Sequence, residues 1–323
     1  MKFIKLTLIV SVIFLSYNSC KDNANENKEQ AISDIEMNEA PFFKLSLAQW
    51  SLHKAIIDDR TLDPMDFADK AKELGFEGVE YVSQLYSYHI EKLGMQAVLD
   101  TLKVRSERTG MENLLIMIDG EGDLASPDEK IRDEAVEKHK KWIDAAQFLG
   151  CHSIRVNLFG SRNNDEWVKA STDGLIKLSA YAATRNVNVL VENHGYLSSN
   201  ADLLMNVMKQ VALANCGTLP DFGNFCLERE GGERWGAKCV KEYDKYVGVR
   251  VLMTWAKAVS AKSYDFDEAG NETTIDYTKM LQIVKDADYT GYIGVEYEGS
   301  RLSEEEGIIA TRDLLINASK KLN

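Results

Sequence analysis

The sequence of 323 residues predicts one α/β domain, built as a closed barrel of eight parallel strands that alternate with helices, a (β/α)8 TIM barrel. Short apolar runs alternate with longer amphipathic stretches, which is typical of repeated strand–helix units in a parallel sheet. Residues 41–323 have about the length of one such barrel, for which roughly 250 residues are typical. No Gly-x-Gly-x-x-Gly follows an apolar run, so the main indication of a dinucleotide-binding sheet is missing.

Eight apolar runs are predicted to be strands: 44–50, 78–82, 113–118, 153–158, 188–193, 217–221, 258–262 and 293–297. The helices between them have recognisable ends. Asp63 before Pro64 is typical of a helix start, and Gly75 can take the left-handed conformation that ends a helix. Pro127 and Gly150 bound the next long helix in the same way.

The N-terminus predicts export. Residues 1–5 are basic and residues 6–15 almost wholly apolar, a run too short for a transmembrane helix. Cys20 follows Ser19, which resembles a bacterial lipobox although Tyr17 and Asn18 depart from its usual form. We therefore expect a lipoprotein signal peptide at residues 1–19, a lipidated Cys20, a flexible polar tether at 20–40 and the barrel domain at 41–323. A secretory signal with an incidental cysteine is the alternative. The expected location is the periplasm or cell surface of a Gram-negative bacterium, with membrane contact only through the lipid.

The chain is acidic, with a formal net charge of −13 that becomes two charges more negative once residues 1–19 are removed. Nucleic-acid binding is not expected, because phosphate contacts need clustered Lys and Arg. An even number of remaining cysteines in an exported chain permits disulfides, and Cys226 with Cys239 is the favoured pair over Cys151 and Cys216. No Cys-x-x-Cys motif predicts a thiolate metal site.

Polar residues recur where the predicted strands end, the end at which such barrels place their chemistry. Glu192, Asp221 and Glu296 come from three different strands, and their convergence would require a compensating charge. A divalent cation, Mg²⁺ or Mn²⁺, suits an all-oxygen set of ligands. The alternatives are rim charges without a metal, or neutralisation by Lys262. The acidic loop of Asp119, Glu121 and Asp123 is expected to be solvated surface.

Four short segments at these ends resemble the xylose isomerase-like barrel superfamily of sugar isomerases and epimerases: residues 191–195, 221–224, 258–262 and 294–297. The resemblance runs from about Leu45 to about Leu315. It implies metal ligands at Glu192, Asp221 and Glu296, with Ser260 at the position where the family usually has His.

The resemblance implies a metal-dependent isomerase or epimerase that moves a proton next to the carbonyl of a free sugar or keto-sugar. Glu192 and Glu296 would be the acid/base pair, and Lys262 would polarise an oxygen or shuttle a proton. The small-molecule carbohydrate would be held by six further residues: Trp50, Glu80, Arg155, Asn157, His194 and Arg301. Two alternatives remain: a lyase that performs β-elimination on 3-keto-glycosides, and a carbohydrate-binding lipoprotein without catalysis. The sequence does not fix the oligomeric state.

Overall fold

The computed structural model describes residues 40–322 of the chain. The predicted signal peptide, Cys20 and the tether up to residue 39 lie outside the described residues. Within residues 40–322, no helix combines the length and the apolar character needed to cross a membrane. Pro41–Leu322 form one unit.

Eight parallel strands form the centre of this unit, in the order β6-β5-β4-β3-β2-β1-β10-β9. The two ends of this sheet are joined, because the Phe222 amide donates to the Ser260 carbonyl at 3.0 Å and the Ser260 amide donates to the Pro220 carbonyl at 2.9 Å. The predicted barrel of eight strands is therefore confirmed, and each predicted run overlaps one strand: β1 (Lys44–Ala48), β2 (Gly78–Val82), β3 (Glu112–Met117), β4 (Ser153–Val156), β5 (Asn188–Glu192), β6 (Cys216–Leu219), β9 (Val259–Ser263) and β10 (Tyr292–Tyr297).

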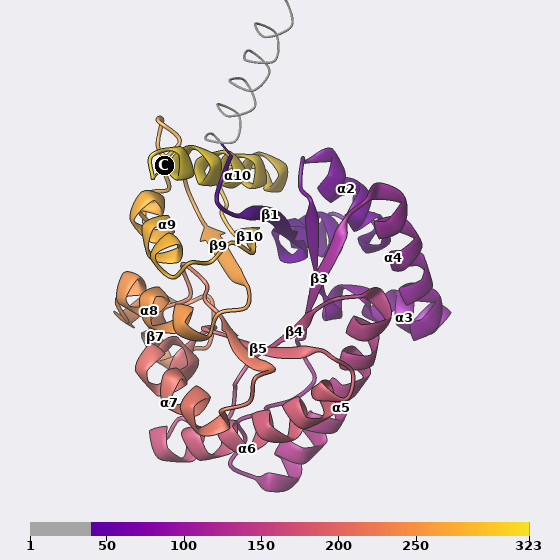
Figure 1. Cartoon of the computed structure of the whole chain (residues 1–323), viewed down its shortest axis with the longest axis vertical. Helices are drawn as coiled ribbons and strands as arrows, with labels where there is room; N and C mark the ends of the chain where they lie inside the picture. Colours follow the sequence, from indigo (N-terminus) through magenta and orange to yellow (C-terminus); the bar gives the residue numbers. More distant parts are fainter. Residues whose placement is uncertain (1–39, 323) are drawn as a thin grey trace, which may run out of the picture. The chain divides into compact units, whose positions relative to one another are not determined.

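Helices form a ring outside the strands (Figure 1). They are α2 (Phe67–Glu73), α3 (Ser87–Leu93), α4 (Met95–Thr109), α5 (Glu129–Leu149), α6 (Asn164–Ala183), α7 (Ala201–Val211), α8 (Lys245–Leu252), α9 (Tyr277–Asp286) and α10 (Glu304–Lys320). The Asp63 side chain accepts the Met65 amide at 2.9 Å, and Gly150 ends α5 at a φ of +82°. These ends agree with the helix signals in the sequence.

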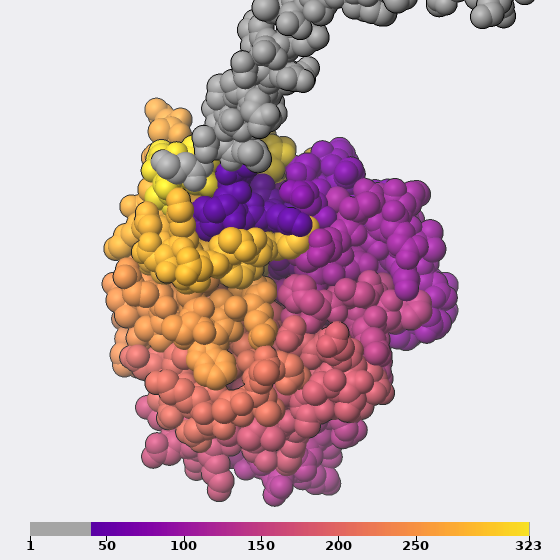
Figure 2. Space-filling view, in the orientation of Figure 1, coloured from indigo at the N-terminus to yellow at the C-terminus, as the bar shows by residue number. Residues whose placement is uncertain are grey.

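Two apolar clusters stabilise the barrel, one on each side of the sheet. Alternate side chains point outward, such as Val189 and Val191 of β5, and pack under the helices. The others point inward, such as Leu190 of β5 and Leu115 of β3, and fill the barrel interior. The first and last strands pair along their length, and Figure 2 shows the two ends of the domain packed against each other. The inward positions nearest the C-terminal strand ends are polar.

A small hairpin of β7 (Cys226–Arg229) and β8 (Cys239–Glu242) interrupts the pattern between β6 and α8. Cys226 and Cys239 form a disulfide, as the sequence favoured, whereas Cys151 and Cys216 are free and buried. Sequence analysis missed the hairpin, because its strands are four residues long and lack a regular alternation of apolar and polar residues.

Candidate active site

Three buried carboxylates meet at the C-terminal end of the barrel. Glu192 ends β5, Asp221 follows β6 and Glu296 lies on β10, and one carboxylate oxygen of each lies within 4.8 Å of the others. They meet because each occupies an inward-pointing position near the end of its strand. The structure therefore brings together the three residues that the sequence singled out as metal ligands.

Burial and mutual repulsion change the protonation of this group. Loss of solvation, opposed by the Arg155 guanidinium and reinforced by Glu296 and Asp221, raises the pKa of Glu192 to about 8. Burial also raises the pKa of Asp221 to about 6, although Lys262 opposes the rise. The protein alone therefore does not fully stabilise three negative charges here.

Ser260 stands between two of the carboxylates. Its hydroxyl lies 2.7 Å from Asp221 Oδ2 and 3.0 Å from Glu296 Oε2, but a hydroxyl has one proton and can donate to only one of them at a time. A positive charge among these oxygens would compensate the negative charges that the protein alone does not fully stabilise. The set of hard oxygen donors fits Mg²⁺ or Mn²⁺, and Ser260 supplies a neutral oxygen at the position where the sequence resemblance implied His.

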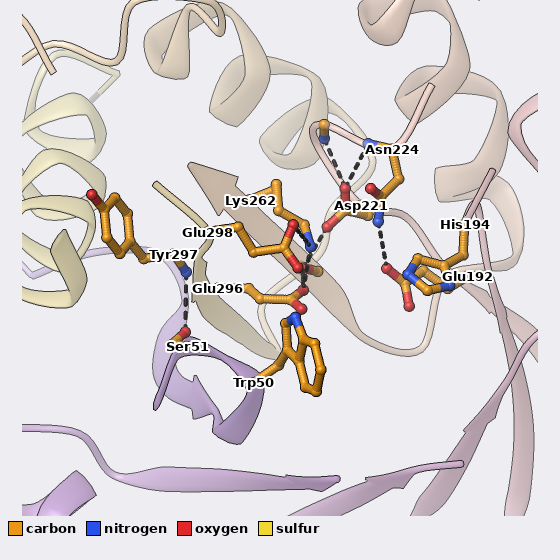
Figure 3. Close-up of polar contacts among 12 residues, drawn as sticks. Trp50, Ser51, Glu192, His194, Asp221, Asn224, Lys262, Glu296, Tyr297 and Glu298 are labelled. Atoms are coloured by element: carbon orange, nitrogen blue, oxygen red, sulfur yellow. Dashed lines mark hydrogen bonds and ion pairs between the residues drawn. The ribbon is translucent and has the colours of Figure 1, made fainter. Parts of the chain in front are cut away.

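Lys262 is a cation in contact with this group, and its side chain is 1% exposed. Its Nζ lies 3.2 Å from Glu296 Oε2 and 3.3 Å from Glu298 Oε2, and Figure 3 shows it between the two. Burial alone would lower the pKa of Lys262, but these carboxylates raise it well above its ordinary value. In turn, Lys262 overcomes the effect of burial on Glu298 and lowers the pKa of that carboxyl. The ammonium therefore remains charged, with its protons directed at the site.

A second polar network lies beside Glu192. Arg155 Nε lies 2.9 Å from Glu192 Oε2, and Arg155 Nη1 donates to Asn157 Oδ1 at 3.2 Å. Asn157 donates through Nδ2 to Asp119 Oδ1 at 2.6 Å, which orients its amide oxygen toward His194 Nδ1 at 2.8 Å. His194 Nδ1 therefore carries the proton and Nε2 is an acceptor. Burial and the Arg155 charge lower the pKa of His194 to about 3, so its imidazole is neutral.

The acidic loop after β3 is a correction to the sequence analysis. Asp119 was expected to be solvated, but it lines the cavity and accepts hydrogen bonds from Arg155 and Asn157. Glu121 is also largely covered, because it accepts from the Trp142 indole at 2.8 Å and pairs with Lys141 at 2.7 Å. Their partners lie on β4, just after it and on α5, far along the chain, so the local acidic pattern did not predict these contacts.

The remaining predicted residues lie at different depths. Trp50 lines the cavity and stacks on His53 with ring centroids 4.6 Å apart. Glu80 is buried deeper, accepts from the Ser46 hydroxyl at 2.6 Å and lies against the backbone of Gly294. Arg301 lies outside the cavity lining, where its Nε pairs with Asp265 at 2.6 Å. The structure thus places Trp50 in the cavity wall, Glu80 deeper in the barrel interior and Arg301 outside the cavity.

The cavity above the carboxylates has a volume of about 580 Å³. Glu296 lines it directly, and Glu192 lies behind Arg155 and Asn224, whose amide donates to Glu192 Oε1 at 3.0 Å. Its wall also contains residues that sequence analysis did not assign to the site: Gln84, Asp119, Phe159, Arg229, Trp235, Tyr264 and Glu298. Glu298 had a usable signal, since it follows Glu296 at the alternation of β10. The aromatic residues had none.

Comparisons with known proteins agree with this fold. A family model described as "Xylose isomerase-like TIM barrel" matches residues 68–318, which is most of the chain, and the protein belongs to this family. No curated protein matches the chain.

Solved structures with the same fold include three at low sequence identity. An L-ribulose 3-epimerase has a TM-score of 0.66 at 14% identity, covering 87% of this chain and 97% of its own. The IOLI protein with a bound zinc atom has a TM-score of 0.63 at 15% identity, covering 86% and 99%. A 3-keto-D-glucoside 4-epimerase from E. coli has a TM-score of 0.62 at 15% identity, covering 84% and 98%.

Proposed function

We propose that the protein is a sugar isomerase or epimerase that depends on a divalent cation, Mn²⁺ or Mg²⁺. The observation that supports this most is the meeting of Glu192, Asp221 and Glu296 beside a charged Lys262, in a cavity at the C-terminal end of the barrel. The family and the similarity to two sugar epimerases agree with this chemistry. The substrate would be a free sugar, a keto-sugar or a glycoside.

Glu192, Asp221 and Glu296 would hold the metal, with Ser260 near the fourth position. A bound cation would act as a Lewis acid that stabilises negative charge on the substrate oxygens. It would also compensate the repulsion that raises the pKa values of Glu192 and Asp221. The similar IOLI protein is described with a bound zinc atom, which supports a divalent metal in a protein of this fold.

The protein groups have separate tasks in the proposed reaction. Glu192 and Glu296 come from strands that are not neighbours in the barrel, so they can approach the substrate from different directions. One carboxylate removes the proton next to the carbonyl, and the other, which starts protonated, gives its proton to the substrate. The first carboxylate then releases its proton to solvent and the second takes one up, which restores the starting state of the protein. Lys262 donates a hydrogen bond to the oxygen that gains charge. Arg155, Asn157 and neutral His194 orient the hydroxyl groups of the sugar.

Ser260 supports a second candidate, a carbohydrate-binding protein without catalysis. A serine oxygen is a weaker ligand than imidazole for many divalent metals, so the site could bind sugar without retaining the ion. The two candidates differ in metal content. Protein that contains no divalent ion, and cannot be loaded with one, would support the binder.

Glu296→Gln tests the enzyme proposal. We expect turnover of keto-sugars with added Mn²⁺ or Mg²⁺ to fall about 10²–10⁴-fold, because the amide cannot exchange the proton. Glu121→Gln is the matched control, since Glu121 pairs with Lys141 outside the cavity. Equal turnover in the wild type and Glu296→Gln would contradict the proposal. Product analysis on 3-keto-glycosides separates epimerisation from β-elimination, the alternative lyase reaction.

We also propose that the chain is exported and anchored by lipid at Cys20, in the periplasm or at the cell surface. The Cys226–Cys239 disulfide supports an oxidising compartment. Labelled palmitate should appear in the wild-type protein and be absent from Cys20→Ser, with both made from the full precursor. Equal labelling, or a soluble wild type, would contradict the anchor.

A further inference from the structure

The disulfide-closed hairpin carries an aromatic residue into the cavity. Trp235 lies between β7 and β8, lines the cavity and contacts His194, with ring centroids 4.7 Å apart. A side-chain carbon added at Gly195 would lie 3.2 Å from the Trp235 ring, so the indole packs closely over this glycine. The side chain is still 43% exposed, which leaves indole surface for a ligand.

Several contacts hold this segment in place. Arg162 donates to the Gly232 carbonyl at 3.0 Å, and Arg229 donates to the Ala237 carbonyl at 2.8 Å. The Arg234 guanidinium lies 4.4 Å from the centre of the Phe159 ring, and Phe159 also faces Trp235 edge to face. The disulfide joins Cys226 at the start of β7 to Cys239 at the start of β8, so it closes the segment that contains Trp235 into a covalent loop. These contacts limit the entropy that Trp235 would lose when a ligand binds.

Trp235 and Trp50 lie on different sides of the barrel mouth. Trp50 follows β1, whereas Trp235 packs on His194 and Gly195, which follow β5. β1 and β5 are four strands apart in a closed barrel of eight, so they are opposite each other. In Figure 3, Trp50 lies beside Glu296 and Glu298, and His194 lies on the other side beside Glu192. The carboxylates therefore lie between two aromatic walls.

The cavity is larger than one sugar ring needs. A hexose has about 12 heavy atoms and would occupy at most about 360 Å³, even at the roughly 30 Å³ that one water molecule has in the liquid. The cavity has about 580 Å³. Phe159 and Trp235 form part of the cavity lining, and their flat apolar faces suit the C–H face of a pyranose.

We propose that the site takes a glycoside of at least two sugar rings, with one ring at the carboxylates and the next ring stacked on Trp235. This inference rests on the proposed sugar chemistry of the carboxylate site and specifies its substrate class. Trp235 is a specificity-determining residue, and the hairpin is the element that positions it.

The test compares disaccharides with their one-ring counterparts by calorimetry on the purified full chain with Mn²⁺ present. The pairs are cellobiose with methyl β-D-glucopyranoside, maltose and trehalose with methyl α-D-glucopyranoside, and lactose with methyl β-D-galactopyranoside. We expect at least one disaccharide to bind about tenfold or more tightly than its counterpart. Trp235→Ala should abolish this preference without changing one-ring binding, and Trp235→Phe should retain part of it.

Trp255→Ala is the matched control. Trp255 precedes β9 and so lies toward the opposite end of the barrel from the site. The Trp255→Ala variant should keep the preference for disaccharides. Thermal unfolding checks that both alanine variants fold. If no disaccharide in the panel binds better than its counterpart, or if Trp235→Ala keeps the preference, the inference is overturned.

Turnover separates this inference from the proposed function. Trp235-dependent binding of a disaccharide, without conversion of any sugar, would support the inference and contradict the enzyme. Conversion of one-ring sugars at rates that Trp235→Ala does not alter, without a preference for two rings, would support the enzyme and overturn the inference.

Discussion

The barrel interior and the β7–β8 hairpin contribute to the same cavity in different ways. The interior supplies buried charges, such as Glu296 and Lys262, that the strands hold at fixed positions. The hairpin supplies an exposed aromatic face, Trp235, held by a disulfide and a few surface contacts. Buried charges are strongly coupled because little water screens them. Chemistry is therefore expected from the interior and substrate selection from the hairpin.

The largest expected effect is the loss of metal binding in Asp221→Asn. Asparagine can still accept the amides of Gly223 and Asn224 at 2.8 Å, so the local fold should remain. Affinity for Mn²⁺, measured by calorimetry, should fall about 100-fold or more, because one of three anionic ligands is lost. In Asp119→Asn, the affinity for Mn²⁺ should stay within about tenfold of the wild-type value. Equal losses in both variants would mean that the cavity attracts cations only through its total charge.

A smaller but measurable effect concerns the pH dependence of stability. Burial raises the pKa of Glu80 to about 7 from its ordinary 4.5, so the folded protein keeps this proton to higher pH than the unfolded chain. The stabilisation from protonated Glu80 is complete below about pH 4.5 and is lost as the pH rises through about 7, at a cost of up to roughly 3 kcal/mol. Glu80→Gln should lack this loss and be more stable than the wild type at pH 8 in urea titrations.

The matched control for Glu80 is Glu134→Gln, whose side chain is exposed on α5. It should follow the wild-type pH profile. If Glu80→Gln also follows that profile, Glu80 is ionised in the folded protein and the interior tolerates more charge than proposed.

Loosening the hairpin should affect substrate binding more than the chemical step or the stability of the barrel. The double variant Cys226→Ser/Cys239→Ser removes a local constraint worth about 3 kcal/mol in the chain-entropy model, but the hairpin can loosen without unfolding the barrel. KM for two-ring substrates should rise about tenfold with kcat unchanged, and the melting temperature should stay within about 4 °C of the wild type. A fall in kcat comparable to that of Glu296→Gln would mean that the hairpin takes part in the chemical step and does not act only in substrate selection.

The smallest effect is expected from Arg301→Ala. Arg301 pairs with Asp265 at the surface, and exposed ion pairs contribute about 0–1 kcal/mol. Unfolding free energy should change by less than about 1 kcal/mol, and steady-state kinetics should stay within about twofold. A tenfold rise in KM would return Arg301 to the substrate-binding role that the sequence suggested.

The eight strands could be predicted because short apolar runs, separated by longer amphipathic stretches, are a local pattern that repeats along the chain. The positions of Glu192 and Glu296 near the ends of two predicted strands also indicated that they lie at the same end of the barrel. Asp119 was misassigned for a definite reason. Its environment depends on Arg155 and Asn157, residues on or just after β4 that lie 36 and 38 positions further along the chain.

The sequence by itself determined the barrel and the strand ends that hold the carboxylates, because both follow from the pattern of residues along one chain. It favoured the pair of Cys226 and Cys239 without fixing it. The tertiary structure alone decided that Ser260 bridges two carboxylates, that Lys262 lies between Glu296 and Glu298, and that Trp235 reaches the cavity. These contacts depend on burial and on distances between segments remote in sequence. The sequence pattern indicates which residues share one side of a strand. It does not indicate which residues of other strands and loops they contact.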